Sequence, residues 1–471
     1  MKTYQLFIDG AWQAGALGTQ EVINPSTEQV AARIPVAGEA DLDKALAAAI
    51  RARNEWANTD VLMRVEILRK AEQILADKIP LVAQQMVAEQ AKTLAEASGE
   101  LQRARDTFRW SAMHAQDLCK PMQVDERRTL MFRPVGIVAA FTPWNYPAVL
   151  TARKIAPALA AGCAVILKAA EEAPASAVAL VEALQEAGLP SGVIALVFGD
   201  PPKISAQLLA SPEVRMITFT GSTRVGKELA ALAAKNLQTC VLELGGHSPV
   251  LVFDDTDIPS AVRAICDYKF EYAGQSCNAP SRVFVQRSCF DEFLRELLKV
   301  AGGIRMGPTD NPAVQMGPMI GAQGPARMGR LTEDAVAKGA RVVLGGREPE
   351  GQGFFWPPTI LTDVPDDAAL MSEEPFGPVL PVAPFDTIDE AIEKANRTSY
   401  GLASYVFTRS EQRERELLDR LASGSVSVNF LKGIAPDVPN PGLRDSGYGH
   451  EGGKEGFRAF QNIKLVNRTG K

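Results

Sequence analysis

The spacing of apolar residues divides the chain into one long helical stretch and two regions where strands and helices alternate. From Asp41 to about Lys120, apolar residues recur with a period near 3.6, which predicts helices. After Val135, short β-prone apolar runs alternate with helical patterns such as Ser176–Ala187 and Arg224–Ala234. The strands expected in this first alternating region are Gly136–Phe141, Ala164–Leu167, Val193–Phe198, Met216–Thr220 and Thr239–Leu244.

A second alternating region begins after Ser248. Its expected strands are Pro249–Phe253, Arg282–Val285, Arg341–Leu344, Ser404–Phe407 and Ser425–Val428. Continuous apolar strands separated by helices are typical of parallel sheets that are covered on both faces, where ligands bind beyond the carboxyl ends of the strands. The sequence therefore predicts an α/β fold with two domains of this kind.

Two segments of extended character belong to neither region. They are Met122–Arg133, which is polar, and Asn462–Val466, close to the end of the sequence. Extended segments outside a domain core often pair across subunits. We therefore expect them to take part in an oligomer.

Composition and charge exclude several classes of protein. At about 150 residues per domain, 471 residues are too many for one compact core. The chain has 50 basic and 56 acidic side chains and a net charge of −6, without a block of like charge, so we expect no nucleic acid partner. No apolar run approaches the roughly 20 residues that span a bilayer, and we find no secretory signal. These features predict a cytoplasmic protein with no membrane contact.

Cysteine and histidine usage argues against a metal site. The chain has 6 cysteines, without a Cys-x-x-Cys pair, and only 3 histidines. This pattern is typical of reduced thiols and gives no ligand set for structural zinc.

Cys277 is the cysteine best placed to react. It follows Gly274-Gln275-Ser276, in a turn-like stretch after the helical pattern Ile258–Phe270. Backbone amides in such a loop can lower the pKa of a thiol, which makes Cys277 a candidate nucleophile. The alternative is a small, buried and inert apolar residue, as most free cysteines are.

Glu243 ends the apolar run Thr239–Leu242 and precedes Leu244-Gly245-Gly246. A partly desolvated carboxylate at the end of a strand can act as a general base. The alternative is a strand-end carboxylate in a salt bridge or a helix cap.

Two further strand ends suit a nucleotide. Phe219-Thr220-Gly221-Ser222 runs from a strand into a helix, whose free amides suit a pyrophosphate, although Ser222 could simply cap the helix. Lys168 and Glu171 follow another strand and could hold a ribose diol. The literal Gly-x-Gly-x-x-Gly at 447–452 has no strand before it, so we reject it as a dinucleotide motif.

Together these motifs resemble the aldehyde dehydrogenase superfamily, in the family's order and over the chain from Asn24 to Gly452. The motifs are Pro143-Trp144-Asn145-Tyr146-Pro147, Lys168-x-x-Glu171-x-x-Pro174, Phe219-Thr220-Gly221-Ser222, Glu243-Leu244-Gly245-Gly246, Gly274-Gln275-x-Cys277 and Glu374-x-Phe376-Gly377-Pro378. The resemblance implies a Rossmann-like NAD-binding domain (1–118 and 135–245) and an α/β catalytic domain (246–440). It also implies a small oligomerisation element with a hairpin (119–134 and 455–471), in a homodimer or homotetramer.

The resemblance also implies a mechanism. The Cys277 thiolate attacks the aldehyde, and the Asn145 amide and the Cys277 backbone N–H hold the oxyanion. Loss of hydride to the nicotinamide leaves a thioester, which water activated by Glu243 hydrolyses to a carboxylic acid. The residues implied in cofactor binding are Trp144, Lys168, Glu171, Gly221, Ser222, Glu374 and Phe376. Because Glu171 would repel a 2′-phosphate, we expect NAD, with NADP as a weaker alternative and no metal.

Arg153 gives the main indication of the substrate. It matches a position where semialdehyde-oxidising relatives carry an arginine that holds the distal carboxylate. Glu271, however, stands where those relatives often have a second arginine. Either an Arg153–Glu271 ion pair or a substrate other than a simple dicarboxylic semialdehyde would explain this exchange.

Departures from the family pattern and rival functions remain open. Tyr272, His247 and Asn440-Pro441 replace residues that are more common in the family, which could reshape the substrate tunnel. One rival is a CoA-acylating dehydrogenase, which Glu243 argues against because that branch usually lacks this base. Others are a binding protein of the same fold that has lost turnover, and a cysteine hydrolase without a cofactor.

Overall fold

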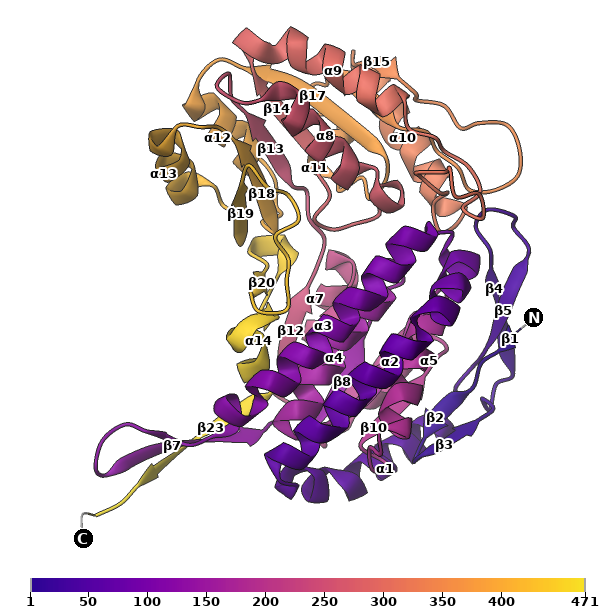
Figure 1. Cartoon of the computed structure of the whole chain (residues 1–471), viewed down its shortest axis with the longest axis vertical. Coiled ribbons are helices and arrows are strands. Elements are labelled where there is room, and N and C mark those ends of the chain that lie inside the picture. The colour runs from indigo at the N-terminus through magenta and orange to yellow at the C-terminus, as the bar shows by residue number, and fades with distance from the viewer. Residues whose placement is uncertain (1, 470–471) are drawn as a thin grey trace.

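Two sheets of mostly parallel strands form the two lobes of the molecule, as Figure 1 shows for the computed structural model, which describes residues 2–469. The first sheet has the order β21 (Gly447–Tyr448), β12 (Thr239–Glu243), β11 (Val214–Thr220), β8 (Ile137–Phe141), β9 (Ala164–Lys168), β10 (Ile194–Val197), β2 (Leu6–Ile8) and β3 (Ala11–Gln13). The second has the order β15 (Arg341–Leu344), β16 (Thr359–Thr362), β17 (Val379–Phe385), β14 (Arg282–Gln286), β13 (Pro249–Val252), β18 (Ala403–Phe407) and β19 (Ser425–Val428). The predicted α/β class is confirmed.

The strands predicted for the two alternating regions are all present, with ends that differ by at most two residues. In the second sheet, β16 and β17 were not predicted. A smaller sheet near the N-terminus contains β1 (Lys2–Thr3), β5 (Val30–Pro35) and β4 (Thr19–Ile23). Within residues 2–469, no helix is both long enough and apolar enough to cross a membrane.

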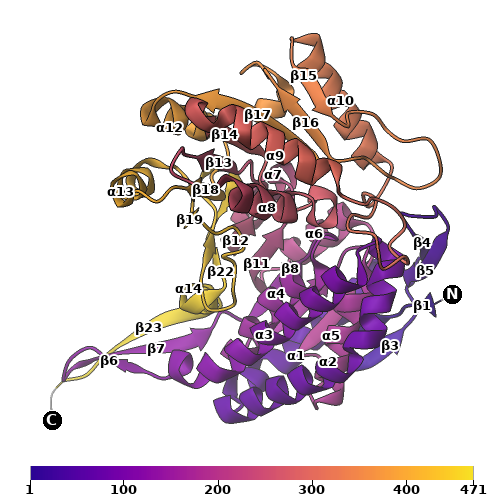
Figure 2. The ribbon, with the colours of Figure 1, turned by 45° about the horizontal axis from the view of Figure 1, so that its top comes forward.

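Helices cover both faces of the first sheet. On one face lie α4 (Pro147–Ala161) and α5 (Pro174–Glu186), with α2 (Val61–Gln90) and α3 (Leu94–Cys119) packed over them (Figure 2). On the other face lie α1 (Glu39–Asn58), α6 (Pro201–Ala210) and α7 (Thr223–Ala234). The predicted helical stretch is thus three helices. Helix α2 ends before Ala91, whose backbone is left-handed. Helix α3 then begins after Thr93, which caps it together with Glu96.

The second lobe contains a separate set of helices. They are α8 (Ile258–Lys269), α9 (Phe290–Gly302), α10 (Gln323–Ala337), α11 (Ala369–Ser372), α12 (Ile388–Asn396) and α13 (Glu411–Arg420). Each lobe has its own apolar core, and the change from one core to the other falls between Leu244 and Val250.

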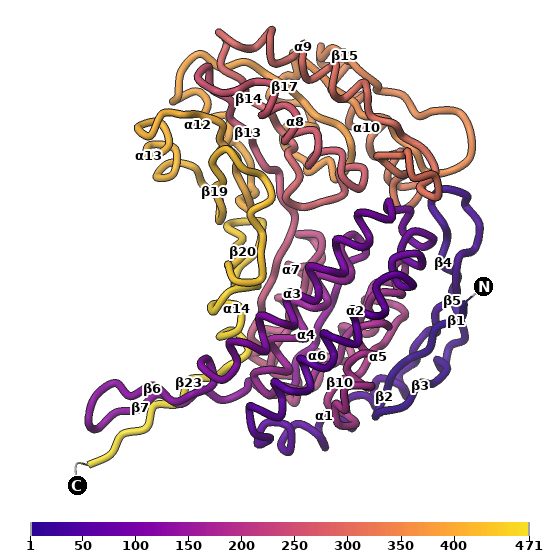
Figure 3. The backbone as a smooth tube through the Cα atoms, viewed as in Figure 1, coloured from indigo at the N-terminus to yellow at the C-terminus, as the bar shows by residue number. Residues whose placement is uncertain are grey.

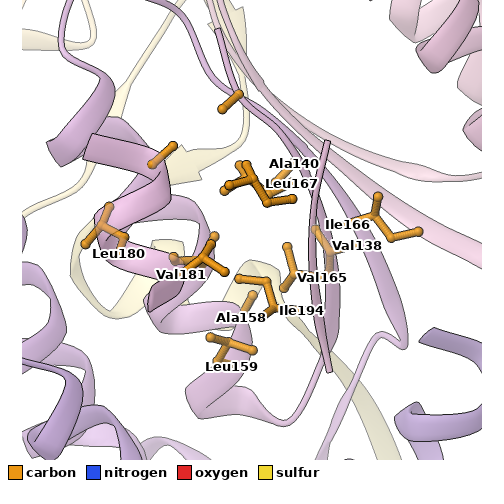
Figure 4. Packing of buried hydrophobic residues seen from close by; sticks show 14 of the residues in the cluster. Val138, Ala140, Ala158, Leu159, Val165, Ile166, Leu167, Leu180, Val181 and Ile194 are labelled. Atoms are coloured by element: carbon orange, nitrogen blue, oxygen red, sulfur yellow. The ribbon is translucent and has the colours of Figure 1, made fainter. Parts of the chain in front are cut away.

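The central strands of the first sheet are buried because both faces meet helices. Figure 4 shows Val165 and Leu167 of β9 close to Leu159 of α4 and Val181 of α5. These residues are at most 1% exposed. Burial of each such side chain contributes roughly 1.5–3 kcal/mol to stability, which fixes the strand ends that carry the polar loops.

An arm projects away from both lobes (Figure 3). It contains β6 (Met122–Gln123), β7 (Arg128–Pro134) and β23 (Gln461–Asn467), and β7 pairs with β23 in antiparallel register. The two extended segments therefore pair with each other within the chain. Helix α14 (Gly453–Ala459) instead packs into the first core through Phe457, and residues 470–471 of the predicted element lie outside the described residues.

Arg282 offers a test of how the second core is held. It begins β14, is 1% exposed, and its guanidinium donates to the carbonyl oxygens of His247, Lys394 and Ala395. Because these buried carbonyls lose their donors, we expect Arg282→Met to lower the free energy of unfolding by about 3 kcal/mol, measured by differential scanning calorimetry. In the control Arg341→Met, which removes an exposed ion pair with Asp363, the change should stay within about 0.5 kcal/mol. Equal shifts in the two variants would contradict this account.

Candidate active site

Adjacent parallel strands bring most of the predicted residues to one edge of the first sheet. Asn145 follows β8, Lys168 ends β9, Gly221 follows β11 and Glu243 ends β12. Strands β12, β11, β8 and β9 are neighbours in this order. The carboxyl ends of parallel strands share one edge, so the sheet itself gathers these residues.

Cys277 reaches this edge from the second lobe, in the loop between α8 and β14. Just before it, Tyr272 (φ 46°) and Ala273 (φ 51°) adopt left-handed backbone conformations that side chains disfavour. The Cys277 thiol donates to Glu243 Oε1 at 3.2 Å, and Asn278 Nδ2 lies 3.4 Å from Sγ. The nucleophile and base predicted from the sequence are therefore in direct contact.

The predicted direction of the Cys277 pKa shift is wrong. Burial, followed by the charges of Glu243 and Glu374, holds the pKa of the thiol well above its usual value. The backbone N–H of Cys277 acts in the opposite direction but is outweighed. The thiol therefore keeps its proton until a neighbouring base accepts it.

Glu243 is suited to accept that proton. It is 3% exposed, and burial, followed by the nearby Glu451 carboxylate, raises its pKa to about 7. Within the described chain, Oε2 has no hydrogen-bond partner, and Glu243 makes neither a salt bridge nor a helix cap. A buried carboxyl group that titrates near neutral pH can both accept and release a proton there.

Asn145 stands beside both groups. Its Nδ2 donates to the carbonyl oxygen of Gln275 at 3.0 Å, and its Oδ1 has no partner among residues 2–469. The amide nitrogen carries a second N–H that this bond does not use. Asn145, Glu243 and Cys277 line the same cavity, so the structure brings the three predicted catalytic residues together.

That cavity has a volume of about 180 Å³ and a charged lining. The basic residues of the lining are Arg103, Arg153 and Lys432. In addition to Glu243, its acidic residues are Asp106 and Glu271. Arg103 and Lys432 were not singled out from the sequence. They lie far along the chain from the motifs, and no local pattern marks them.

The Arg153–Glu271 ion pair, one of the two explanations offered for Glu271, is not formed in the described chain. Lys432 forms the ion pair with Glu271 instead, while Arg153 Nη2 donates to the carbonyl oxygen of Ala435 at 3.1 Å. Arg153 is 5% exposed and lines the cavity. The charge of Glu271 is thus balanced by a residue that the sequence analysis missed.

A buried ion pair lies behind the base and was also missed. Lys154 Nζ bonds the Glu451 carboxylate and donates to Thr220 Oγ1 at 2.8 Å. Thr218 Oγ1 donates to the same carboxylate at 3.2 Å. Glu451 lies inside the Gly-x-Gly-x-x-Gly segment that we rejected as a dinucleotide motif. An acidic residue within a glycine-rich turn was the only local signal.

The residues predicted for the adenosine end of a dinucleotide lie at strand ends. Lys168 Nζ donates to Glu171 Oε2 at 2.6 Å, and the Gly199 N–H donates to Glu171 Oε1 at 3.0 Å. Ser222 caps α7, because its Oγ accepts from the Val225 N–H at 3.4 Å. The capping alternative for Ser222 is therefore present, and Ser222 is itself exposed, so the start of the helix is accessible.

Glu374 and Phe376 are not among the residues that line the cavity. Glu374 Oε1 accepts from the Gly246 N–H at 3.0 Å, and burial raises its pKa to about 7. The Phe376 ring meets the Trp144 ring edge-on, with centroids 5.6 Å apart. A Cβ at Gly245 would lie 2.7 Å from Glu374 Oε2, so glycine keeps space beside this carboxylate.

The residues that depart from the family pattern have different surroundings. His247 is buried, with Nδ1 2.8 Å from Ser281 Oγ and Nε2 3.1 Å from the Leu370 carbonyl oxygen. Burial holds its pKa well below the usual value, so it is neutral. Tyr272 is buried within the nucleophile loop and does not line the cavity, whereas Asn440 does.

Comparison with known proteins identifies the family. The family model described as "Aldehyde dehydrogenase family" matches residues 12–466. The chain is 42% identical to a 4-(hydroxymethyl)benzenesulfonate dehydrogenase of Comamonas testosteroni, over 98% of each chain. It is 37% identical to a glutarate-semialdehyde dehydrogenase of Pseudomonas aeruginosa, over 98% of this chain and 97% of that one. A crystal structure of an E. coli NADP dependent enzyme superimposes with a TM-score of 0.96, at 36% identity and 98% coverage of both chains. The predicted resemblance is confirmed, and the chain belongs to the aldehyde dehydrogenase family.

Proposed function

We propose that this chain oxidises an aldehyde that carries a distal anionic group to the corresponding carboxylic acid, through a thioester on Cys277. The observation that carries the mechanism is the 3.2 Å contact between Cys277 Sγ and Glu243 Oε1, with Asn145 lining the same cavity. Nucleophile, base and amide donor are the groups that acyl chemistry on a thiol requires.

The first step uses the raised pKa values of both partners. Cys277 Sγ bonds to the carbonyl carbon while its proton passes to the Glu243 carboxylate, so a charged thiolate is not held for long in a buried site. The carbonyl oxygen becomes an oxyanion. Asn145 Nδ2 and the Cys277 backbone N–H are the donors that stabilise it.

NAD(P), when bound, supplies the acceptor of the hydride that the substrate loses. The residues that would hold it are Lys168, Glu171, Gly221, Ser222, Glu374, Phe376 and Trp144. The donor set fits: two carboxylates can accept from ribose hydroxyl groups, and free amides at the start of α7 suit a pyrophosphate. The space that Gly245 keeps beside Glu374 supports the same assignment.

Glu243 acts again in the second half of the reaction. Once it has released the thiol proton, it accepts a proton from the water that attacks the thioester carbonyl. The carbon–sulfur bond breaks, a carboxylate leaves, and Cys277 is free again. A CoA-acylating enzyme would transfer the acyl group to a thiol instead, and Glu243 beside the sulfur supports water as the acceptor.

Glu171 supports a preference for NAD over NADP. Its carboxylate lies at the strand end where the adenosine ribose would bind, and it would repel a 2′-phosphate. Lys168, paired with Glu171, reduces this repulsion, so weaker use of NADP is consistent with the site. The similar E. coli structure described as an NADP dependent enzyme is consistent with this weaker use of NADP.

The substrate class rests on the charge of the cavity. Arg153 is buried in the lining, and Arg103 lies nearby without a salt-bridge partner in the described part of the chain. The names of two relatives specify a 4-(hydroxymethyl)benzenesulfonate and a semialdehyde of glutarate, both of which carry an anionic group. A carboxylate or sulfonate at the far end of the aldehyde would neutralise Arg153.

We further propose a cytoplasmic homodimer or homotetramer built on the arm. Ile463 is 65% exposed and Leu465 52% exposed, both on β23, so the arm presents apolar side chains without cover. Domain roles follow the two cores, with cofactor binding in the first and catalysis in the second.

The proposed activity is tested by following NADH or NADPH formation at 340 nm, with NAD and NADP in separate assays. The substrates are neutral aldehydes, ω-carboxy aldehydes and sulfonated aldehydes. We expect reduction with NAD to exceed that with NADP, and Cys277→Ala to lower kcat by about 10⁴-fold or more. Mass spectrometry with and without CoA identifies the product as an acid or an acyl-CoA. No reduction of either cofactor by wild type with any aldehyde would overturn the proposal.

Arg153 should select for the distal anion. Removing its charge in Arg153→Met should lower kcat/KM for glutarate semialdehyde by roughly 10-fold to 100-fold, the cost of one charge-assisted hydrogen bond. For pentanal, which lacks the distal charge, the change should stay within about threefold by the same reasoning. Arg153→Lys, which keeps the charge, should recover part of the loss. Similar losses for both aldehydes would mean that Arg153 only supports the fold.

The coupling between Cys277 and Glu243 predicts a pH effect without substrate or cofactor. In Glu243→Gln the carboxylate charge is removed, so the pKa of Cys277 should fall. The midpoint of iodoacetamide alkylation against pH should then move to lower pH by about 1–3 units. The control Glu72→Gln alters a buried carboxylate that pairs with Arg105, far along the sequence from the site, and should leave the midpoint unchanged. A midpoint in Glu243→Gln at or above that of wild type would show that the two groups are not coupled.

A further inference from the structure

Two acidic residues and a lysine at the start of α3 lie behind the active site without lining its cavity. Lys92 immediately precedes the helix cap, and Glu96 and Glu100 lie one turn apart on one side of the helix. The side chains of Lys92 and Glu100 are completely buried, and they form an ion pair. None of the three contributes to the lining of the catalytic cavity.

Glu100 caps the helix that follows Asn145. Tyr146, the N-cap residue of α4, provides no side-chain hydrogen bond to the helix start. Glu100 Oε1 instead accepts from the Ala148 N–H at 2.7 Å and from the Val149 N–H at 3.4 Å. A carboxylate at this position satisfies free amides and complements the helix dipole. The start of α4, and with it Asn145, is thus fixed to α3.

Glu96 holds the loop of the nucleophile. Its Oε1 accepts from the Tyr272 N–H at 2.7 Å, while its Oε2 accepts from the Thr93 N–H. Tyr272 and Ala273 have left-handed backbones, a conformation that persists only where the surroundings fix it. The bond from Glu96 acts at the first of these two residues, five positions before Cys277.

Lys92 lies between the two segments. Its Nζ is 4.3 Å from the centroid of the Tyr146 ring and 4.5 Å from that of the Tyr272 ring. The ammonium group therefore contacts an aromatic residue beside Asn145 and another in the nucleophile loop. The same two segments meet directly where Asn145 Nδ2 donates to the Gln275 carbonyl oxygen.

We propose that Glu96 and Glu100, with Lys92 between them, are positioning residues that set the separation of the Asn145 amide from Cys277. The amide comes from one lobe and the nucleophile from the other, and this face of α3 is bonded to both. These residues act through the donors of the oxyanion and not on the substrate itself. The inference rests on the proposed function, because it assigns Asn145 and Cys277 the roles given there.

The test separates a reaction that forms an oxyanion from one that does not. Acylation of Cys277 by 4-nitrophenyl acetate passes through a tetrahedral oxyanion and needs no cofactor, whereas alkylation by iodoacetamide is a displacement at carbon without an oxyanion. Loss of alignment in Glu96→Ala should slow the acylation burst by about 10-fold to 100-fold. Alkylation at the same pH should change by less than about threefold, because that displacement uses no oxyanion donor.

Two conservative variants show whether geometry is the cause. Glu96→Gln keeps an oxygen that can accept from the Tyr272 N–H, so the burst should largely recover. Glu96→Asp keeps the charge but withdraws it by one methylene, so the burst should stay slow. The control Glu72→Ala removes a carboxylate from a salt bridge on the same helical layer and should leave both reactions unchanged.

The outcomes distinguish this inference from the proposed function. If wild type shows neither an acylation burst nor aldehyde oxidation, the proposed function fails. If wild type shows both, and Glu96→Ala slows acylation and alkylation by the same factor, the residue supports the fold only and the positioning role is wrong. Equal acylation rates in Glu96→Ala and wild type would overturn it as well. Calorimetric melting of each variant shows that it is folded at the assay temperature.

Discussion

The contact between the Cys277 thiol and the Glu243 carboxylate joins the two halves of the chain, because Glu243 ends a strand of the first sheet and Cys277 lies in a loop of the second lobe. Burial raises the pKa of both groups, and the charge of Glu243 raises that of Cys277 further, whereas the hydrogen bond from the thiol lowers that of Glu243. The thiol therefore keeps its proton until the Glu243 carboxylate accepts it across the contact. The end of β12, which carries Glu243, and the loop between α8 and β14, which carries Cys277, together set this distance.

The surrounding buried charges follow from the same constraint. Lys154 and Glu451 form an ion pair behind Glu243, and Glu451 adds to the rise in the Glu243 pKa while Lys154 opposes it. An isolated buried charge would be costly, and pairing with added hydrogen bonds to Thr218 and Thr220 reduces that cost. Burial and the charge of Glu451 thus raise the pKa of Glu243, and the charge of Lys154 partly offsets this rise. The result is a pKa of about 7 without a direct ion pair.

Local patterns predicted the strands and the residues at their ends, because buried parallel strands read as continuous apolar runs. The same rule explains why β17 was missed: Pro381 and Pro384 interrupt its pattern, although neighbouring strands pair along it. Long-range pairs were beyond this approach. Lys154 and Glu451 are 297 positions apart, and Lys432 and Glu271 are 161 apart, so no spacing rule connects them. The direction of the Cys277 pKa was also missed, because it depends on burial and on two carboxylates from other segments.

The exchange at Glu271 changes how the cavity can hold an anion. The family resemblance implies an arginine at this position in many semialdehyde-oxidising enzymes, so Glu271 would replace a cation by an anion. Lys432 neutralises that anion through an ion pair, but a paired ammonium group is less available to a substrate than a free one. In the proposed function, the attraction for a distal carboxylate or sulfonate would then fall mainly on Arg153, whose guanidinium donates to the Ala435 carbonyl oxygen, and on the exposed Arg103. Because Arg153 is buried and Arg103 is exposed in the same cavity, aldehydes of different length could each bring a distal anionic group close to one of them.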